Sequence, residues 1–233
     1  VAHGQLNSTA NPGIYRSLDG GASWALLGGG LPTSDFGRCP LAIRPAASGP
    51  SVVYAGVSNA NTRAVVGLFR STNGGDTWTN IAAVNWANSQ AWYDNAIGVS
   101  PHNPNLVLCG GLDWYRSTQG GTGLGQVTYW YNGYMGVIPA GGEEGSPDYV
   151  HADQHAIAFH PTDPQVIYVG SDGGIFKSSD GGQTWVGRNG GLVTTQFYAG
   201  FAGGYASSGL AVGGLQDNGT VKYTGSRSWS KIF

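Results

Sequence analysis

One twelve-residue unit recurs along this chain of 233 residues and limits its possible folds more than any other feature. It reads GIYRSLDGGASW at 13–24, GLFRSTNGGDTW at 67–78 and GIFKSSDGGQTW at 174–185, with weaker copies at 113–124 and 220–229. With the fifth residue of the full unit (Ser17 in the first copy) as the marker, successive copies lie 54, 46, 61 and 46 residues apart. Repeats of roughly 40–50 residues, each with four short strands, are typical of β-propeller blades.

A second unit precedes the first in each period. AIGVSPHNPNLVLCGG (96–111) and AIAFHPTDPQVIYVGS (156–171) both read as strand, proline turn, strand, and 41–57 follows the same plan. One period therefore holds strands A, B, C and D, with a glycine turn between C and D. Glycine supplies 41 of the 233 residues, which suits many tight reversals. The sequence predicts an all-β protein of four-stranded antiparallel blades.

Counting strands divides the single propeller segment 1–233 into about five blades. Residues 1–31 supply strands B, C and D only, and complete blades follow at 32–85, 86–138, 139–192 and 193–233. Propellers close by joining their ends so that no sheet edge stays open. The sequence has no strand A for the first blade, so we expect a piece of a larger propeller, seven-bladed or double. A five-bladed ring is the alternative.

Composition narrows the partners and the compartment. Only 10 % of residues are charged, the net charge is -2, and the 11 lysines and arginines are scattered, which argues against a nucleic-acid partner. No apolar run approaches the roughly 20 residues of a membrane span. Low charge and abundant Gly, Asn, Thr and Ser favour a secreted, extracellular protein. Cys39 and Cys109 could form a disulfide or remain free thiols.

The pattern S-x-D-x-G-x-T-W within the repeat resembles the Asp-box, or BNR repeat, of sialidases, sortilin-type receptors, xyloglucan-cleaving propellers and a photosystem assembly factor. That resemblance implies a structural role on the outer C–D turn. The positions that match are Ser17, Asp19, Gly21 and Trp24; Ser71, Asn73, Gly75 and Trp78; and Ser178, Asp180, Gly182 and Trp185.

The chemistry of the turn predicts the same structural role. A glycine pair supplies the positive φ angles of a tight turn, and an aspartate side chain can accept backbone N–H bonds within it. The tryptophan that opens strand D can pack against a neighbouring blade. We therefore expect these residues to hold the blade together and to take no part in catalysis.

The second half of the chain resembles large exported bacterial proteins of the sortilin-like, BNR-propeller type, which are often catalogued as glycosyl hydrolases. The resemblance implies secretion and a longer parent protein, and it carries no established substrate. The segments that match are QAWYD, GGLDWYRS, HADQHAIAFHP, GSDGGIFKSSDGGQTW, TTQFY and GGLQDNGT, in this order.

Acidic residues are unevenly placed. Four of the 13 fall in C–D or A–B turns, and the other nine lie in or beside D–A and B–C connections, which share the opposite face of a blade. We therefore predict a binding site for a glycan or a protein ligand at the channel mouth on that face. The candidate ligand-binding residues are Asp94, Asp153, Asp172, Gln216 and Asp217.

The segment HADQH offers a possible divalent-metal site. In an extended strand, His151, Asp153 and His155 would point to one side, and imidazole and carboxylate groups are good ligands for zinc, manganese or iron. The bland alternative is that inner-strand polar groups bind one another and channel water.

Three functions stay open from the sequence. The favoured one is a non-catalytic recognition or scaffold module; the others are a fragment of a glycoside hydrolase with a pair of aspartates, and a metal-binding structural propeller. No arginine triad of a sialidase is recognisable.

Overall fold

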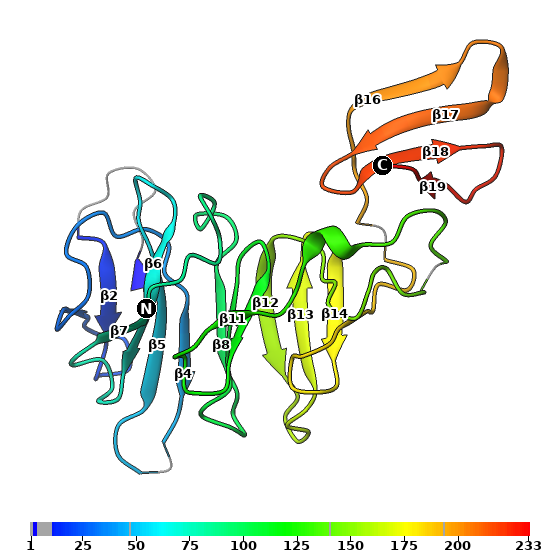
Figure 1. The fold of residues 1–233 in the computed structure, drawn as a ribbon. Helices are drawn as coiled ribbons and strands as arrows, with labels where there is room; N and C mark the ends of the chain where they lie inside the picture. Colours follow the sequence, from blue (N-terminus) through cyan, green and yellow to red (C-terminus); the bar gives the residue numbers. More distant parts are fainter. Residues whose placement is uncertain (1, 4–10, 47, 140, 193) are drawn as a thin grey trace.

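The computed structural model describes residues 2–3, 11–46, 48–139, 141–192 and 194–233, which form five antiparallel sheets (Figure 1). Each sheet is a meander whose strands pair in chain order. Sheet 1 has β1 (Ala2–His3), β2 (Gly13–Arg16) and β3 (Ala25–Leu27); sheet 2 has β4 (Leu41–Arg44), β5 (Val52–Ser58), β6 (Val65–Ser71) and β7 (Thr79–Ala82); sheet 3 has β8 (Ala96–Val99), β9 (Val107–Gly110), β10 (Trp114–Ser117) and β11 (Gly125–Gln126); sheet 4 has β12 (Gln154–Phe159), β13 (Ile167–Ser171), β14 (Gly174–Ser178) and β15 (Val186–Gly187); sheet 5 has β16 (Phe197–Gly204), β17 (Ser207–Leu215), β18 (Gly219–Tyr223) and β19 (Ser230–Lys231).

The prediction of an all-β chain with four-stranded antiparallel sheets is confirmed. Sheets 2 to 5 have four strands each, and sheet 1 has three in its described part. One short 3-10 turn, η1 (Trp130–Asn132), is the helical element of the described residues. Of the first strand expected from the sequence, Ala2 and His3 form β1, while Val1, Gly4 and Gln5 lie outside the described residues.

The repeated turn between the third and fourth strands is closed by its own side chains. In sheet 4, Ser178 Oγ donates to Asp180 Oδ1 at 2.8 Å and accepts the N–H of Gly182 at 2.8 Å. Asp180 in turn accepts the N–H and the hydroxyl of Thr184 at 2.9 and 2.6 Å. Gly182 has φ 86°, which glycine adopts without strain. These contacts lie within one turn and hold its geometry.

The turns of sheets 2 and 4 also contact the preceding sheet. Arg16 Nη1 donates to the carbonyl of Gly74 at 3.0 Å, and Arg116 Nε donates to that of Gly181 at 2.8 Å. The inner strands β4, β8 and β12 lie side by side, and large side chains fill the spaces between sheets. Trp114 and Phe176, for example, lie in the core between sheets 3 and 4. The core is therefore a series of layers between neighbouring sheets.

Sheet 5 is placed differently. It stands apart from the row of the other four sheets in Figure 1 and is tied to the segment before sheet 4 by backbone hydrogen bonds between Lys231 and Gly136, both 2.8 Å. Lys177 occupies the same position of the repeat as Arg16 and Arg116, but its ammonium group lies over the ring of Tyr168 on the same sheet. Ile175, on the same strand β14, is 46 % exposed.

The fold also answers the question of the disulfide. Cys39 and Cys109 are both buried free thiols, so the disulfide alternative is wrong. Among the described residues, no helix combines the length and the apolar character needed to cross a membrane.

The burial of Ser178 leads to a stability prediction. Replacing Ser178 with alanine is expected to lower the free energy of unfolding by about 1–3 kcal/mol, because the buried N–H of Gly182 loses its acceptor. Ser17 makes the same bonds in a turn whose tryptophan, Trp24, is 50 % exposed, so water can replace them. Urea unfolding of both variants measures the difference. Equal losses in Ser178→Ala and Ser17→Ala would contradict it.

Candidate functional site

Four of the aspartates selected from the sequence meet at the junction of sheets 3, 4 and 5. Carboxylate oxygens of Asp153, Asp172 and Asp217 all lie within 4.8 Å of one another. Asp153 precedes β12, Asp172 lies in the β13–β14 turn and Asp217 in the β17–β18 turn. Asp94, which precedes β8, is joined to them through Gln90, whose Nε2 lies 3.0 Å from Asp94 Oδ2 and 2.6 Å from Asp153 Oδ1. We call these four aspartates the acidic cluster.

Gln216, the fifth selected residue, supports the cluster from its edge. Its Nε2 donates to Asp217 Oδ2 at 2.8 Å, and its backbone N–H donates to the carbonyl of Gln196 at 2.9 Å. Other acids of the same loops stay out of the cluster. Asp113 accepts from Thr128 and from the backbone of Trp130, and Glu144 accepts from Asn189.

An aromatic side chain lies at the edge of the cluster. The hydroxyl of Tyr93 donates to Asp172 Oδ2 at 2.7 Å, and its ring packs edge-on against that of His155 with centroids 4.9 Å apart. His155 Nε2 lies 2.6 Å from Asp172 Oδ1. Trp92 packs beside Tyr93 and is 45 % exposed. Gln90, Trp92 and Tyr93 were not selected from the sequence, although all three lie in the motif QAWYD (90–94), which ends at the selected Asp94.

Burial and mutual repulsion of the carboxylates shift pKa values in and around the acidic cluster. Burial and the neighbouring Asp153 carboxylate raise the pKa of Asp94, which is 0 % exposed. Burial and the charges of Asp172 and Asp217 likewise raise the pKa of Asp153. The hydrogen bond to Asp172, with burial, raises the pKa of Tyr93 to about 12. Within the described chain, the ion pairs are Arg16–Asp76 and His155–Asp172, so no lysine or arginine pairs with the cluster.

The triplet His151, Asp153 and His155 is not assembled as the sequence predicted. Strand β12 begins only at Gln154, Asp153 has φ 66°, and a bulge follows between Gln154 and Ala156, so the assumed alternation of side chains does not apply. His151 is 5 % exposed and packs against Gly173, while His155 bonds Asp172. Among described residues, the group with metal-ligand spacing is Asp153, Asp172 and Asp217.

This group of carboxylates suits a hard divalent cation. Calcium, magnesium and manganese prefer oxygen ligands, and Ca²⁺ takes carboxylates at flexible geometry. Bringing three carboxylates together without a lysine or arginine costs free energy through mutual repulsion, and a bound cation offsets it. Asp153 and Asp217 are held with φ 66° and 55°, a left-handed conformation that aspartate tolerates better than most residues. The three aspartates of this group therefore suit a hard divalent cation, whereas the predicted zinc site with two histidines is not formed in the described residues.

Comparison with known proteins informs the fold alone. No family model matches the chain, and no curated protein matches it. Solved structures do match. An ancestral GH74 enzyme is 18 % identical with a TM-score of 0.53, over 99 % of this chain and 31 % of its own. The GH74 xyloglucanase from Xanthomonas campestris is 19 % identical (TM-score 0.46; 82 % and 30 % covered), and YCF48 bound to D1 peptide is 14 % identical (TM-score 0.40; 96 % and 88 % covered).

The chain spans less than a third of the length of the GH74 enzymes that it matches. With the meander sheets and the layered core described above, the likeness to the ancestral enzyme shows that this chain has the fold of a β-propeller.

Proposed function

We propose that this chain is a non-catalytic recognition module that binds a glycan through a divalent cation held by the acidic cluster. One observation carries the proposal: Asp153, Asp172 and Asp217 converge within 4.8 Å from two different sheets, with no lysine or arginine paired to them in the described residues. A cation at this point would neutralise the cluster and keep coordination positions open for ligand oxygens.

A glycan suits the surroundings of the cluster. Trp92 and Tyr93 are 45 % and 38 % exposed and pack against each other with ring centroids 5.6 Å apart. Exposed aromatic rings bury the apolar faces of a ligand while polar groups at their edge fix its orientation. Sugar rings combine apolar faces with hydroxyl groups that can complete the coordination of a cation. The rings of Trp92 and Tyr93 would therefore contact the apolar face of a sugar, and the cation at the acidic cluster would bind its hydroxyl groups.

The binding of calcium tests the first half of the proposal. Titration calorimetry of the purified chain with CaCl₂ is expected to give one site per chain, and Ca²⁺ is expected to raise the melting temperature. Asp172→Asn should weaken binding by at least about tenfold, because a ligand charge is lost and each 1.4 kcal/mol corresponds to that factor. Glu143→Gln, an exposed acid outside the cluster, is the control and should bind as the native chain does.

A glycan array tests the second half. The native chain should retain glycans in Ca²⁺ and release them in EDTA, and Trp92→Ala should lose glycan binding while it keeps the cation. Absence of calcium binding, or identical affinity in Asp172→Asn, would overturn the cation site. Glycan binding that EDTA and Trp92→Ala leave unchanged would overturn the proposed mode of recognition.

Glycoside hydrolysis is the second candidate, and the spacing of the same carboxylates favours it. Retaining hydrolases hold two carboxyl groups about 5–5.5 Å apart, and the described separation of Asp153, Asp172 and Asp217 is compatible with that geometry. Burial works against it, because Asp94 is 0 % exposed and Asp153 is 7 % exposed. Release of reducing sugar by the native chain but not by Asp172→Asn would decide for hydrolysis.

The wider setting belongs to the same proposal. We infer a secreted protein with further blades or domains beyond this chain, in which the serine–aspartate turns act as Asp-box repeats of a sortilin-like, BNR-type propeller. The support is the low content of charged residues and the closed hydrogen bonding of the turns at 17–24, 71–78 and 178–185. Detection of the protein in the culture medium of its source is the direct test of secretion.

A further inference from the structure

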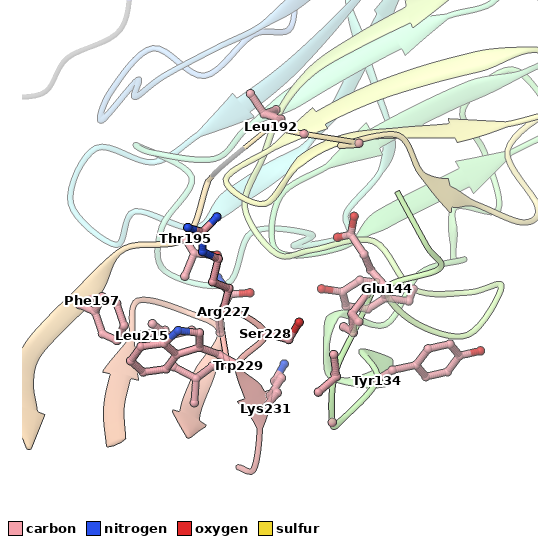
Figure 2. A pocket seen from close by; sticks show the side chains of 18 residues that line it. Tyr134, Glu144, Leu192, Thr195, Phe197, Leu215, Arg227, Ser228, Trp229 and Lys231 are labelled. Carbon is pink, nitrogen blue, oxygen red and sulfur yellow. The ribbon is translucent and has the colours of Figure 1, made fainter. Parts of the chain in front are cut away.

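A second candidate site lies away from the acidic cluster, between sheet 5 and the segment 134–149. The cavity there has a volume of about 680 Å³, which falls in the range of small-molecule sites. Figure 2 shows Trp229, Arg227 and Lys231 on the side of sheet 5, with Glu144 and Tyr134 across the cavity. The pocket is therefore built by two parts of the chain that are far apart in sequence.

Aromatic and aliphatic side chains make the apolar part of this pocket. The ring of Trp229 packs against Phe197 and Tyr223, with centroids 5.5 and 5.2 Å apart, so its position is fixed by other rings. Leu215 and Val221 line the pocket beside it. A flat, ordered ring of this kind is a platform for another aromatic group, at little cost in side-chain entropy.

Two cations give the pocket its polarity. Lys231 is partly buried, and burial lowers its pKa. Arg227 is exposed at the same pocket. Neither forms one of the ion pairs of the described residues. Glu144, the acid of the pocket, is bonded to Asn189 at 2.8 Å, and burial raises its pKa. The pocket thus has an excess of positive charge next to an aromatic floor.

We propose that this pocket binds a small aromatic carboxylate, with the ring on Trp229 and the carboxylate at Lys231 and Arg227. A partly buried ammonium group without an anion is unfavourable, and a ligand carboxylate would supply the missing charge-assisted hydrogen bond. The apolar walls favour a ring over a fully polar anion such as phosphate. This site goes beyond the proposed glycan function and uses none of its residues.

Calorimetry with 2-naphthoate and its neutral counterpart 2-naphthamide tests the proposal. The native chain should bind 2-naphthoate at least about tenfold more tightly than 2-naphthamide, since a hydrogen bond to a charged group contributes roughly 1.5–3 kcal/mol. Lys231→Met keeps the length of the side chain and should abolish this preference. Lys222→Met is the matched control, because Lys222 lies on β18 outside the pocket lining and should leave the preference unchanged.

Two additional variants keep the test decisive. The backbone bonds of Lys231 to Gly136 do not depend on its side chain, and a melting curve checks that Lys231→Met is folded. If Lys231→Met is unstable, Arg227→Gln serves in its place. Arg227 is exposed, and its replacement should likewise weaken the preference for the carboxylate. Asp172→Asn should bind 2-naphthoate normally, which separates this site from the acidic cluster. Failure of the native chain to bind 2-naphthoate, or equal binding of acid and amide, would overturn the proposal.

Discussion

Replacing Trp114 with alanine is expected to lower the free energy of unfolding by about 4 kcal/mol and to abolish cation binding at the acidic cluster. Trp114 is 0 % exposed and packs in the core between sheets 3 and 4 with Leu108, Ile167 and Phe176. Removal of a fully buried indole leaves a cavity that neighbouring strands cannot fill without moving. A large loss of stability is therefore the first consequence.

The second consequence concerns the site. The indole Nε1 of Trp114 donates to Gln154 Oε1 at 2.7 Å, and Gln154 Nε2 donates to the carbonyl of His151 at 2.5 Å. Gln154 is also 0 % exposed, and its N–H bonds the carbonyl of Gly111 at 2.8 Å. These bonds position the segment that carries Asp153. Without the indole, the buried amide oxygen of Gln154 has no donor, so the position of Asp153 is no longer fixed.

Two comparisons make this prediction specific. Trp114→Phe should cost about 2 kcal/mol, because it keeps most of the ring but leaves Gln154 without its donor. Trp24→Ala, at a tryptophan that is 50 % exposed, should cost less than about 1 kcal/mol. Urea unfolding followed by circular dichroism gives the stabilities, and calorimetry with CaCl₂ gives the cation affinity. Native-like cation affinity in a folded Trp114→Phe would show that the indole does not position the site.

The link between Trp114 and Gln154 also marks a limit of prediction from the sequence. The period of the repeat predicts four strands per sheet, because turn residues and apolar runs are local signals. It also places Asp94, Asp153, Asp172 and Asp217 on one face, since D–A and B–C connections share the same face of every sheet. A hydrogen bond between side chains of two different periods has no local signature, so Trp114 could not be assigned a role beforehand.

The extended strand expected for His151, Asp153 and His155 is not found, for a related reason. Alternation of side chains holds only within a regular strand, and Asp153 with φ 66° stands just before β12 begins. The pocket beside Trp229 could not be predicted from the sequence, because its walls depend on the position of sheet 5. The last repeat copy, TVKYTGSRSW, lacks the glycine pair of the other turns. A Cβ at Gly225 would meet no atom within 4 Å, so this turn does not pack closely against a neighbouring sheet as a regular repeat would predict.

Replacing Asp94 with asparagine is expected to remove much of the alkaline loss of stability of this chain. Asp94 is 0 % exposed, its Oδ1 has no hydrogen-bond partner among the described residues, and burial raises its pKa. Between the ordinary carboxyl pKa near 4 and this raised pKa, the folded state holds a proton that the unfolded state releases. The free energy of unfolding therefore falls as the pH rises through that window.

Asparagine has nearly the same shape and carries no charge, and its side-chain oxygen can still accept from Gln90. Asp94→Asn should consequently melt several degrees above the native chain at about pH 9, on the order of 4–8 °C for about 2 kcal/mol, and close to it at about pH 4. Glu143→Gln, exposed and outside the cluster, should follow the native curve at every pH.

Calcium sharpens the test of Asp94→Asn. A cation on Asp153, Asp172 and Asp217 reduces the negative potential that opposes ionisation of Asp94, so saturating Ca²⁺ should narrow the alkaline difference between the variant and the native chain. Differential scanning calorimetry from about pH 4 to about pH 9, with Ca²⁺ and with EDTA, measures both effects. If the melting temperatures of the two proteins change in parallel with pH across this range, Asp94 is not the buried acid that causes the loss of stability. Its replacement would then leave the number of protons released on unfolding unchanged.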